Sequence, residues 1–295
     1  MKMYNFNDLK TTFQKSIFTW GYFTDFEKVK LNIKKVEIEL NILNSLIGKD
    51  DIESAFISLI KQYPNIRTAL PLLIATRKIK LKDTPIVSDV NTLISENKSY
   101  IFYDTLNAKV EQELGIFFDE SGIKDIFQNR HIKNLIDYCF GVEVGLDSNG
   151  RKNRTGILME NIVSSYLAGF CGVNRNFSFI EQATQMSIKD NFNYDIQTDK
   201  NSRRFDFALY NNQTDKLYLI EVNYYGGGGS KLKATAGEYQ TLNDFVKSQG
   251  IDFIWITDGQ GWLTALNPLE ETFNHNDHVI NLSMLKSNAL NDICK

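Results

Sequence analysis

Two carboxylates separated by a short turn are the residues of this chain best suited to chemistry. Asp206 lies in the stretch Arg-Arg-Phe-Asp-Phe, and Glu221 follows in Ile-Glu-Val-Asn. The segment 211–215 between them is a cluster of turn-forming residues flanked by aromatic and branched side chains, which predicts a β-hairpin. A hairpin brings the two carboxylates onto neighbouring strands. Hard oxygen ligands placed in this way suit Mg²⁺, which accepts few protein ligands and keeps water and phosphate in its other positions.

Alternation along the two expected strands decides which side chains face the same way. Arg204 and Asp206 share one face of the first strand, and Glu221 and Asn223 share one face of the second. The pattern predicts metal-assisted hydrolysis of a phosphodiester, in which the metal polarises a phosphoryl oxygen and lowers the pKa of a bound water. For an Asp–Glu pair considered alone, a strand-end cap and an exposed strand residue would be the simpler interpretation.

Asn223 stands one side chain beyond Glu221, where nucleases of the PD-(D/E)xK superfamily usually carry a lysine. The chain resembles their motif in the form D…ExN. An amide is no general base, but it can hold the attacking water by hydrogen bonds, so the proton acceptor stays unassigned. The main-chain carbonyl of Val222 is included among the expected metal ligands.

A run of glycines and lysines follows the second strand. Residues 226–229 are four glycines, and Lys231 and Lys233 come shortly after. Glycines let backbone amides approach a ligand closely and lysines supply positive charge, so this composition fits phosphate binding. The run matches neither a Walker loop nor a dinucleotide-binding motif, and a flexible loop without function is the alternative.

A second basic segment precedes a predicted helix. Residues 145–156 combine glycines with Arg151, Lys152 and Arg154, which predicts a loop that contacts a nucleic-acid backbone. The apolar spacing from residue 157 predicts a helix, with Glu160 at the edge of its buried face. A charge at that place needs a partner. Either a metal or metal-bound water beside the two carboxylates, or a salt bridge to an arginine, would provide one.

Together these segments make the chain similar to type II restriction endonucleases of the DpnII/MboI type. The resemblance rests on GLDSNGRKNRTG with Glu160 after it, RRFDF, IEVNYYGGGGSKL, FIWITDGQGW, and looser matches at 21–29 and 65–77. It implies a Mg²⁺-dependent homodimer that recognises GATC in unmethylated double-stranded DNA and cuts 5′ of the G. It also implies a companion adenine methyltransferase, with no stable complex between the two proteins. The candidate catalytic residues are Asp206, Glu221, Asn223 and Glu160, and the candidate DNA-binding residues are Arg151, Lys152, Arg154, Arg204, Lys231 and Lys233.

The composition of the chain excludes several classes of protein. With 295 residues, of which 42% are hydrophobic, the chain can bury a large core. Its three scattered cysteines and three histidines fit neither a disulfide framework nor a zinc site. No signal peptide or membrane-spanning stretch is expected, so the protein is expected in the cytoplasm without a membrane role. The formal charge of −3 does not exclude DNA binding, because binding depends on local basic clusters. A further basic cluster at residues 77–82 is interpreted as a solvated strand or loop face.

The sequence pattern changes near residue 145. Residues 1–144 are expected to be mainly helical and to serve DNA recognition, dimerisation or both, and residues 145–295 to form the nuclease catalytic core. In the first region, helices are predicted over 26–46, 52–63, 109–118 and 123–140, and a short strand over 99–103. In the second, strands are predicted at 194–196, 205–210, 217–225 and 251–257, with a capping box opening a helix at 235–247. This crossover helix makes the last strand parallel to its neighbour, so the expected fold is an α/β, PD-(D/E)xK restriction-endonuclease-like mixed β-sheet flanked by helices.

Other functions share parts of this pattern. A repair nickase or junction resolvase would use the same nuclease core and would nick DNA or cut branched substrates. A non-catalytic DNA-binding protein is suggested by the missing lysine at Asn223, and metal-dependent cleavage that vanishes with Asp206→Ala would exclude it. A nucleotide-binding module would rest on the glycine run alone.

Overall fold

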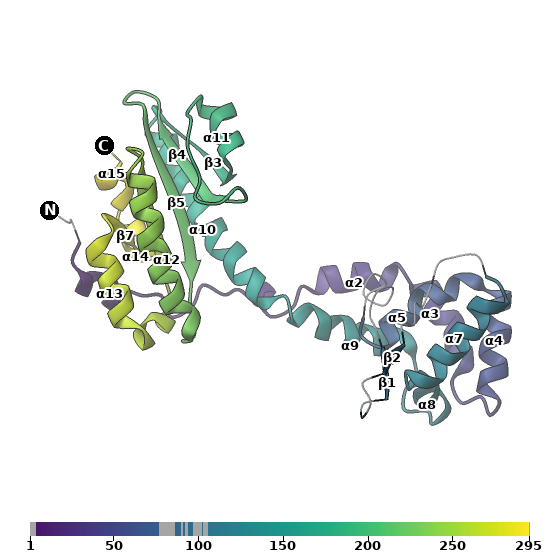
Figure 1. The fold of residues 1–295 in the computed structure, drawn as a ribbon. Coiled ribbons are helices and arrows are strands. Elements are labelled where there is room, and N and C mark those ends of the chain that lie inside the picture. Colours follow the sequence, from purple (N-terminus) through teal and green to yellow (C-terminus); the bar gives the residue numbers. More distant parts are fainter. Residues whose placement is uncertain are drawn as a thin grey trace. The chain divides into compact units, whose positions relative to one another are not determined.

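The computed structural model describes residues 4–76, 86–89, 91, 94–96, 102 and 106–294. These residues form two compact units, one comprising residues 20–151 and the other residues 1–19 together with 152–295. Each unit has a hydrophobic core of its own, and Figure 1 labels the elements of both. The basic segment 77–82 lies outside the described residues, as does all of the strand expected at 99–103 except Phe102.

The unit of residues 20–151 is mainly helical. Its helices bury apolar side chains one turn apart, as Ile52, Phe56 and Ile60 do in α4. The side chains of Asn107 and Asn134 cap α7 and α9 by accepting backbone N–H bonds from the first turn. In chain order the elements are η1 (Trp20–Tyr22), α2 (Phe26–Lys34), α3 (Glu37–Leu43), η2 (Asn44–Leu46), α4 (Ile52–Gln62), η3 (Pro64–Ala69), α5 (Leu70–Leu73), β1 (Ile86–Asp89), β2 (Ile94–Glu96), α7 (Ala108–Glu120), α8 (Ile123–Gln128) and α9 (Leu135–Ser148).

Helical periodicity predicts these helices but not their breaks. The helix expected over 52–63 is confirmed as α4. The one expected over 26–46 is interrupted at Lys35 and Val36, whose N–H groups bond three residues back and so close α2 with a tight turn. The one expected over 123–140 is divided into α8 and α9, and Arg130 between them has a left-handed φ of 53°. Periodicity reports which face is buried, and a buried face can continue across a break in the backbone.

The second unit is built on a five-stranded sheet in the order β3-β4-β5-β6-β7. The neighbours β3, β4 and β5 are antiparallel, whereas β6 and β7 run parallel to β5. The mixed sheet, the hairpin and the parallel strand after a crossover helix are therefore confirmed. The elements are α1 (Phe6–Thr11), α10 (Arg151–Val173), β3 (Phe177–Ala183), α11 (Gln185–Phe192), β4 (Phe205–Asn211), β5 (Lys216–Tyr224), α12 (Ser230–Lys247), β6 (Asp252–Asp258), η4 (Gln260–Thr264), α13 (Leu266–His275), β7 (His278–Ile280), α14 (Leu282–Lys286) and α15 (Ala289–Ile293).

Two long helices cover the two faces of this sheet, with α12 in front of it and α10 behind it in Figure 1. On α12, the ring of Tyr239 packs edge-on against Phe253 and Trp255 of β6, at centroid distances of 5.8 and 5.2 Å. On α10, the ring of Phe170 packs against Phe177 of β3 at 4.9 Å. The sheet is thereby held between apolar layers, and polar groups on α12 are brought to the face that carries Glu221.

Two local predictions in this unit are wrong, and one strand is missed. Residues 194–196 are not a strand, because Tyr194 packs in a loop against the ring of Tyr210. The edge strand β3 was not predicted. The helix expected at 235–247 begins earlier, at Ser230, so Thr235 is no capping residue, and its hydroxyl is paired with that of Tyr225 at 2.8 Å.

The loop expected over 145–156 is also wrong. Residues 145–148 end α9 and α10 begins at Arg151, so only a turn at Asn149 and Gly150 separates the two helices. The N–H of Gly150 bonds to the carbonyl of Asp147 at 2.9 Å. A glycine inside a helix costs only about 1 kcal/mol relative to alanine, which the packing of a long helix outweighs. Arg151 and Arg154 therefore lie on the first turns of α10.

The segment Asn153–Val173 of α10 is long and apolar enough to cross a bilayer by length and composition. By this measure the expectation that the chain has no such stretch is not met. Its residues Met159, Val163 and Leu167 are buried in the core of the unit at intervals of four. This spacing is also that of a helix that packs one face against a sheet.

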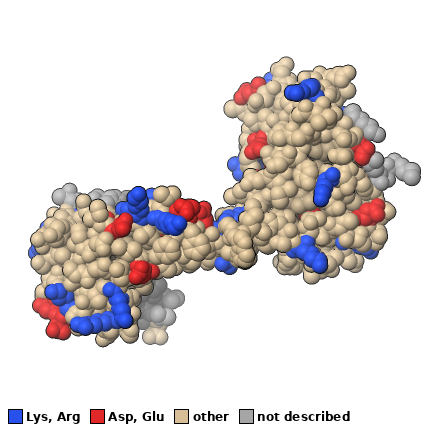
Figure 2. Space-filling model, turned by 180° about the vertical axis from the view of Figure 1, so that it is seen from behind, with Lys and Arg blue, Asp and Glu red and all other residues tan. Residues whose placement is uncertain are grey.

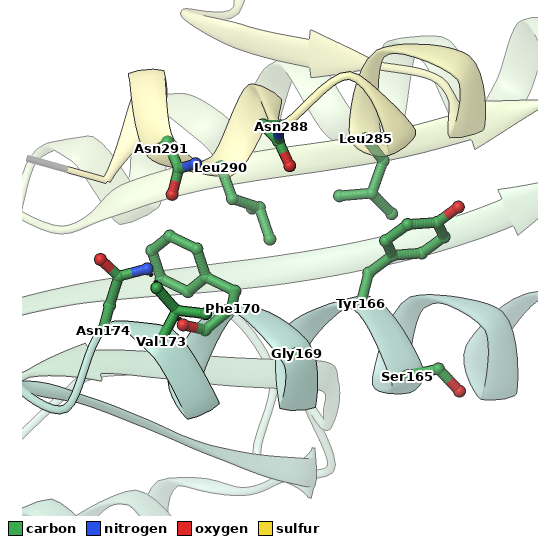
Figure 3. Close-up of a pocket in the computed structure, with 10 residues that line it drawn as sticks. All are labelled: Ser165, Tyr166, Gly169, Phe170, Val173, Asn174, Leu285, Asn288, Leu290 and Asn291. Atoms are coloured by element: carbon green, nitrogen blue, oxygen red, sulfur yellow. Dashed lines mark hydrogen bonds between the residues drawn. The ribbon is translucent and has the colours of Figure 1, made fainter.

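A groove of about 240 Å³ lies between α10 and the C-terminal helices α14 and α15 (Figure 3). Its apolar lining includes Tyr166, Phe170, Leu285 and Leu290. The predicted catalytic side chains are not among its lining residues.

Candidate active site

Asp206 and Glu221 face each other across the hairpin. The register of β4 and β5 pairs Phe207 with Ile220, and one further step along the same register places Asp206 opposite Glu221. The backbone N–H of Val222 donates to Oδ2 of Asp206 at 2.8 Å. The two carboxyl groups also hydrogen-bond to each other. The hairpin therefore brings together the two side chains that the sequence places on neighbouring strands.

Glu221 is buried and Asp206 is half-buried. Burial raises the pKa of Asp206, and it raises the pKa of Glu221, which is 6% exposed, well above the usual range. The charge of Asp206 and the hydrogen bond between the carboxyls raise the pKa of Glu221 further. Two facing carboxyls in such a place favour a shared proton, whereas a divalent cation bound to both would favour the ionised forms.

Helix α10 brings Glu160 to the same place. Burial and then the charge of Asp206 raise the pKa of Glu160, and the charge of Arg204 lowers it. Oε2 of Glu160 accepts a hydrogen bond from Nε2 of Gln182 at 2.6 Å. Glu160 thus has an amide as its hydrogen-bond partner, and it lies near enough to Asp206 and Arg204 to respond to their charges.

Gln182 is a site residue for which the sequence holds no signal. It lies in β3, where the pairing with β4 passes from Glu181 to Ala183 and skips it. Its φ of 51° is left-handed, which costs a residue other than glycine about 1–2 kcal/mol. Strained backbone often accompanies a functional side chain, and here the strained residue holds Glu160.

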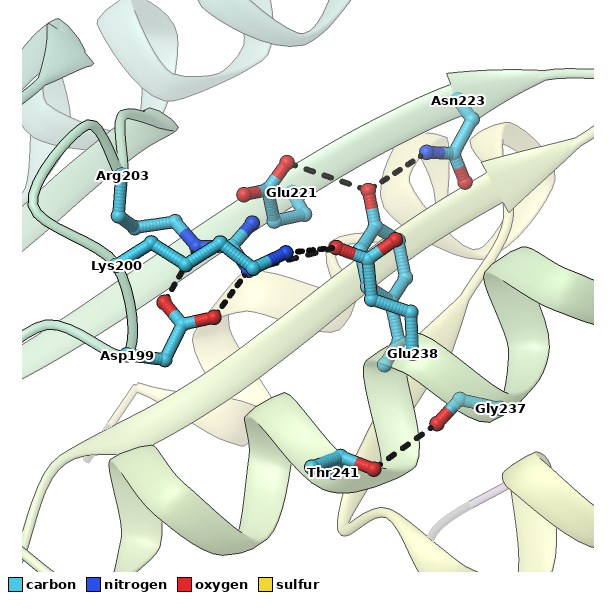
Figure 4. Close-up of polar contacts among 9 residues, drawn as sticks. Asp199, Lys200, Arg203, Glu221, Asn223, Gly237, Glu238 and Thr241 are labelled. Atoms are coloured by element: carbon cyan, nitrogen blue, oxygen red, sulfur yellow. Dashed lines mark hydrogen bonds and ion pairs between the residues drawn. The ribbon is translucent and has the colours of Figure 1, made fainter.

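Asn223 is held from two sides. Its Oδ1 accepts a hydrogen bond from Nε1 of Trp255 at 2.6 Å, and its Nδ2 donates to the hydroxyl of Tyr239 at 3.1 Å. The same hydroxyl donates to Oε2 of Glu221 at 3.3 Å. Figure 4 shows Glu221 and Asn223 joined through this hydroxyl on α12. Burial raises the pKa of Tyr239 far above its usual range, so the phenol keeps its proton.

The two arginines before β4 have different surroundings. The guanidinium of Arg203 binds both carboxylate oxygens of Asp199, at 2.7 and 2.6 Å, and lies 3.4 Å from Glu238 (Figure 4). Its charge also lowers the pKa of Glu221. The side chain of Arg204 is exposed, and its charge lowers the pKa of Asp206. Arg203 therefore holds the loop that leads into β4, whereas Arg204 is accessible to a ligand.

Part of the glycine run has a packing role. A Cβ atom at Gly228 would lie 2.4 Å from Oγ1 of Thr264, so a side chain there would displace η4. The N–H of Gly261 donates to the carbonyl of Tyr225 at 2.8 Å. Close approach of the two backbones requires glycine at position 261, where a Cβ would lie 2.3 Å from the carbonyl oxygen of Gly227. At Gly227 and Gly229 a Cβ would meet no atom within 4 Å, so those two positions leave room for a ligand.

The basic residues predicted to bind DNA occupy several elements. Lys231 and Lys233 are exposed on the first turn of α12, directly after the glycine run. Arg154 is half-buried on α10. On the face drawn in Figure 2, basic and acidic side chains are interspersed.

The remaining two basic residues begin α10. In the helical unit, Nε of Arg151 donates to the carbonyl of Phe23 at 3.2 Å, and its guanidinium lies 5.8 Å from the ring of that residue. Lys152 follows in the helix, and its side chain lies outside the described part of the structure.

The described part of the chain holds no group of three or more His, Cys, Asp or Glu side chains placed to hold a metal ion. Mg²⁺ is commonly bound through one or two carboxylates, with water and phosphate completing its coordination. Asp206 and Glu221, whose pKa values are raised mainly by burial, fit that requirement.

A mixed sheet with paired carboxylates on adjacent strands and exposed basic side chains nearby defines a nuclease with the restriction-endonuclease-like fold. The model of the DpnII restriction endonuclease family matches residues 5–292, and the chain belongs to that family. It is therefore a type II restriction endonuclease, a site-specific deoxyribonuclease that acts on double-stranded DNA.

Similar proteins cover nearly the whole chain. It is 47% identical to the type II restriction enzyme MjaIII of Methanocaldococcus jannaschii, over 98% of this chain and 99% of that protein. It is 42% identical to the type II restriction enzyme DpnII of Streptococcus pneumoniae, over 98% of each. Identity to the type II restriction enzyme MboI of Moraxella bovis is 35%, over 95% of this chain and 93% of that protein. No solved structure matches the chain significantly.

Proposed function

We propose that this restriction endonuclease makes Mg²⁺-dependent double-strand cuts at GATC in unmethylated DNA, 5′ of the G. The observation that carries the metal-dependent part is the pair of half-buried Asp206 and buried Glu221, whose carboxyls face each other and have raised pKa values. The GATC site and the position of the cut rest on the resemblance to the DpnII/MboI type.

The proposed metal ligands are Asp206, Glu221 and the main-chain carbonyl of Val222, with Glu160 acting through a water. When bound, Mg²⁺ would polarise a phosphoryl oxygen, lower the pKa of a bound water and neutralise developing charge. The N–H of Val222 keeps Asp206 in place, and Gln182 does the same for Glu160.

The remaining proposed roles belong to polar and basic side chains. Each polar atom of Asn223 makes one hydrogen bond within the protein, which leaves a second Nδ2 hydrogen and a second Oδ1 lone pair to hold the attacking water. Exposed Arg204, beside Asp206, would contact the scissile phosphate. The DNA backbone would be bound by Arg151, Lys152, Arg154, Lys231 and Lys233.

We assign DNA recognition, dimerisation or both to residues 1–144 and catalysis to residues 145–295. A homodimer matches a palindrome, because each subunit then meets the same bases and the same scissile phosphate. The system would include an adenine methyltransferase that protects host DNA, without a stable complex between the two enzymes. Both would act in the cytoplasm, where the DNA is.

Digestion of one genomic DNA in adenine-methylated and unmethylated copies, followed by sequencing of the ends, tests the proposal. We expect Mg²⁺-dependent ends that begin with GATC, in the unmethylated copy only. Ends at another sequence would overturn the GATC assignment while leaving the enzyme class intact. Nicks alone, or cleavage restricted to branched DNA, would point to a repair nickase or a resolvase. Cleavage that persists in a chelator would contradict the proposed dependence on a metal ion.

A further inference from the structure

A hydrogen-bonded series of three side chains ends on Glu221. It runs from the indole of Trp255 to Asn223 at 2.6 Å, from Asn223 to the hydroxyl of Tyr239 at 3.1 Å, and from that hydroxyl to Glu221 at 3.3 Å. Trp255 is fully buried and Tyr239 is 8% exposed, so water competes little for these bonds. Neither Tyr239 nor the indole N–H of Trp255 belongs to the site that the sequence predicts.

The first member of the series sets the direction of all its bonds. An indole N–H only donates, so the oxygen of the Asn223 amide must face Trp255. The nitrogen of the same amide then faces Tyr239, and an amide nitrogen also only donates. The phenol oxygen must accept that bond, so its single proton is left for Oε2 of Glu221. A flipped amide would set two donors against each other at 2.6 Å.

We propose that this series positions Glu221 for metal binding and that Tyr239 is the residue that holds the Glu221 carboxylate in place. The phenol proton holds Oε2 and leaves Oε1 for a cation shared with Asp206. Asn223 accordingly has a second role, since it transmits the orientation set by Trp255. The inference rests on the proposed metal site. It adds to that site Tyr239 of α12 as a positioning residue and Trp255 of β6 as the residue that orients Asn223.

The packing of Tyr239 makes the proposal testable by removal of one atom. Its ring is held edge-on by Phe253 and Trp255, at 5.8 and 5.2 Å. Tyr239→Phe keeps these ring contacts and deletes only the hydroxyl. Tyr225→Phe is a matched control, because it deletes a phenol hydroxyl in the same unit that is paired with Thr235 at 2.8 Å and not with a carboxylate.

The experiment measures Mn²⁺ binding to the full chain by electron paramagnetic resonance, along with single-turnover cleavage as Mg²⁺ is varied and DNA binding in chelator. Mn²⁺ takes the same oxygen ligands as Mg²⁺. We expect Tyr239→Phe to weaken Mn²⁺ binding by about 10-fold or more, as loss of a group that orients a metal ligand usually does. Cleavage should need correspondingly more Mg²⁺, with DNA binding in chelator unchanged. Tyr225→Phe should match the wild type in every measurement.

Trp255→Phe tests the direction of the series. It removes the donor that orients the amide, so we expect weaker Mn²⁺ binding although the indole hydrogen-bonds to Asn223 and not to a carboxylate. Wild-type Mn²⁺ affinity in folded Trp255→Phe would overturn the part assigned to Trp255. Thermal unfolding shows whether Trp255→Phe is folded. If it is misfolded, Tyr239→Phe alone tests whether the series positions Glu221.

Glu221→Gln separates this inference from the proposed function. If Glu221→Gln binds Mn²⁺ as the wild type does, the metal site itself is misassigned. If Glu221→Gln loses Mn²⁺ while Tyr239→Phe keeps it, the metal site stands and the positioning role of Tyr239 is overturned. An equal loss in Tyr225→Phe and Tyr239→Phe would also overturn it, because the effect would then be general to buried phenols.

Discussion

Asp206 and Glu221 lie directly opposite each other on β4 and β5, and their carboxyl groups share a hydrogen bond. In this position the two groups oppose each other's ionisation, because both are partly or fully withdrawn from water and like charges repel. The hairpin that pairs the carboxylates thus creates a site in which ionisation of both groups is unfavourable. Binding of a divalent metal would relieve this unfavourable arrangement.

Loss of either carboxylate should abolish cleavage and spare DNA binding. Both residues are assigned to the metal and neither to base recognition, so Asp206→Ala and Glu221→Ala should each lower the single-turnover rate by roughly 1000-fold or more. Binding of duplex DNA by each variant should stay close to that of the wild type. Substantial cleavage by either purified variant in Mg²⁺ would contradict the assignment.

The metal-free protein should lose stability as the pH rises. The pKa of Glu221 is raised on folding, so the folded chain holds a proton that the unfolded chain releases. The stability linked to that proton is complete below the unfolded pKa, near 4.5, and is lost as the pH rises through the folded value. Glu221→Gln removes this loss and should melt at a higher temperature than the wild type at neutral pH in chelator. Melting curves recorded from about pH 5 to pH 8 test this, and equal pH dependence in the two proteins would contradict it.

Glu160 should matter less than the facing pair. It is bonded to Gln182 and senses Asp206 through its charge, which suits a ligand that acts through water. Glu160→Gln should reduce the cleavage rate by about 10–100-fold, as substitution of outer-sphere groups usually does. Gln182→Ala should also reduce the cleavage rate. Wild-type rates in both variants would make this pair structural.

Lys231 and Lys233 should contribute to affinity without contributing to specificity. Both are exposed at the start of α12 beside the glycine run. Each alanine substitution should weaken binding similarly on target and non-target DNA and lower the slope of log affinity against log salt by about 0.9. Lys247→Ala at the other end of α12 is the control, because Lys247 is paired with Asp277 at 2.5 Å. Selective loss of target binding with an unchanged slope would place one of these lysines in base recognition.

Substitution of Arg203 should affect the stability of the protein, whereas substitution of Arg204 should affect cleavage. The Arg203 side chain is 11% exposed and binds Asp199 through two hydrogen bonds, so Arg203→Ala should lower the free energy of unfolding by about 1.5–3 kcal/mol. Exposed Arg204 should contribute little to stability, but Arg204→Ala should slow cleavage by removing charge next to Asp206. Urea denaturation and single-turnover kinetics measure the two effects. The reverse pattern would exchange the assigned roles.

Local sequence predicts the catalytic strands because the relevant information is itself local. Alternation with a period of two puts Glu221 and Asn223 on one face, and the turn formers at 211–215 pair that strand with the one that carries Asp206. The crossover helix likewise predicts the parallel strand β6. Family motifs that span the chain add the class of enzyme, which matches the family shown by comparison.

Tertiary structure decides the groups that surround the carboxylates. Tyr239 reaches Glu221 from α12, and Gln182, whose backbone has a left-handed φ, reaches Glu160 from β3. Local signals also misplace the start of α12, which begins at Ser230, five residues before the expected cap Thr235, whose hydroxyl pairs with that of Tyr225. These arrangements depend on which elements pack together, and periodicity, turn signals and capping patterns describe only what each segment favours by itself.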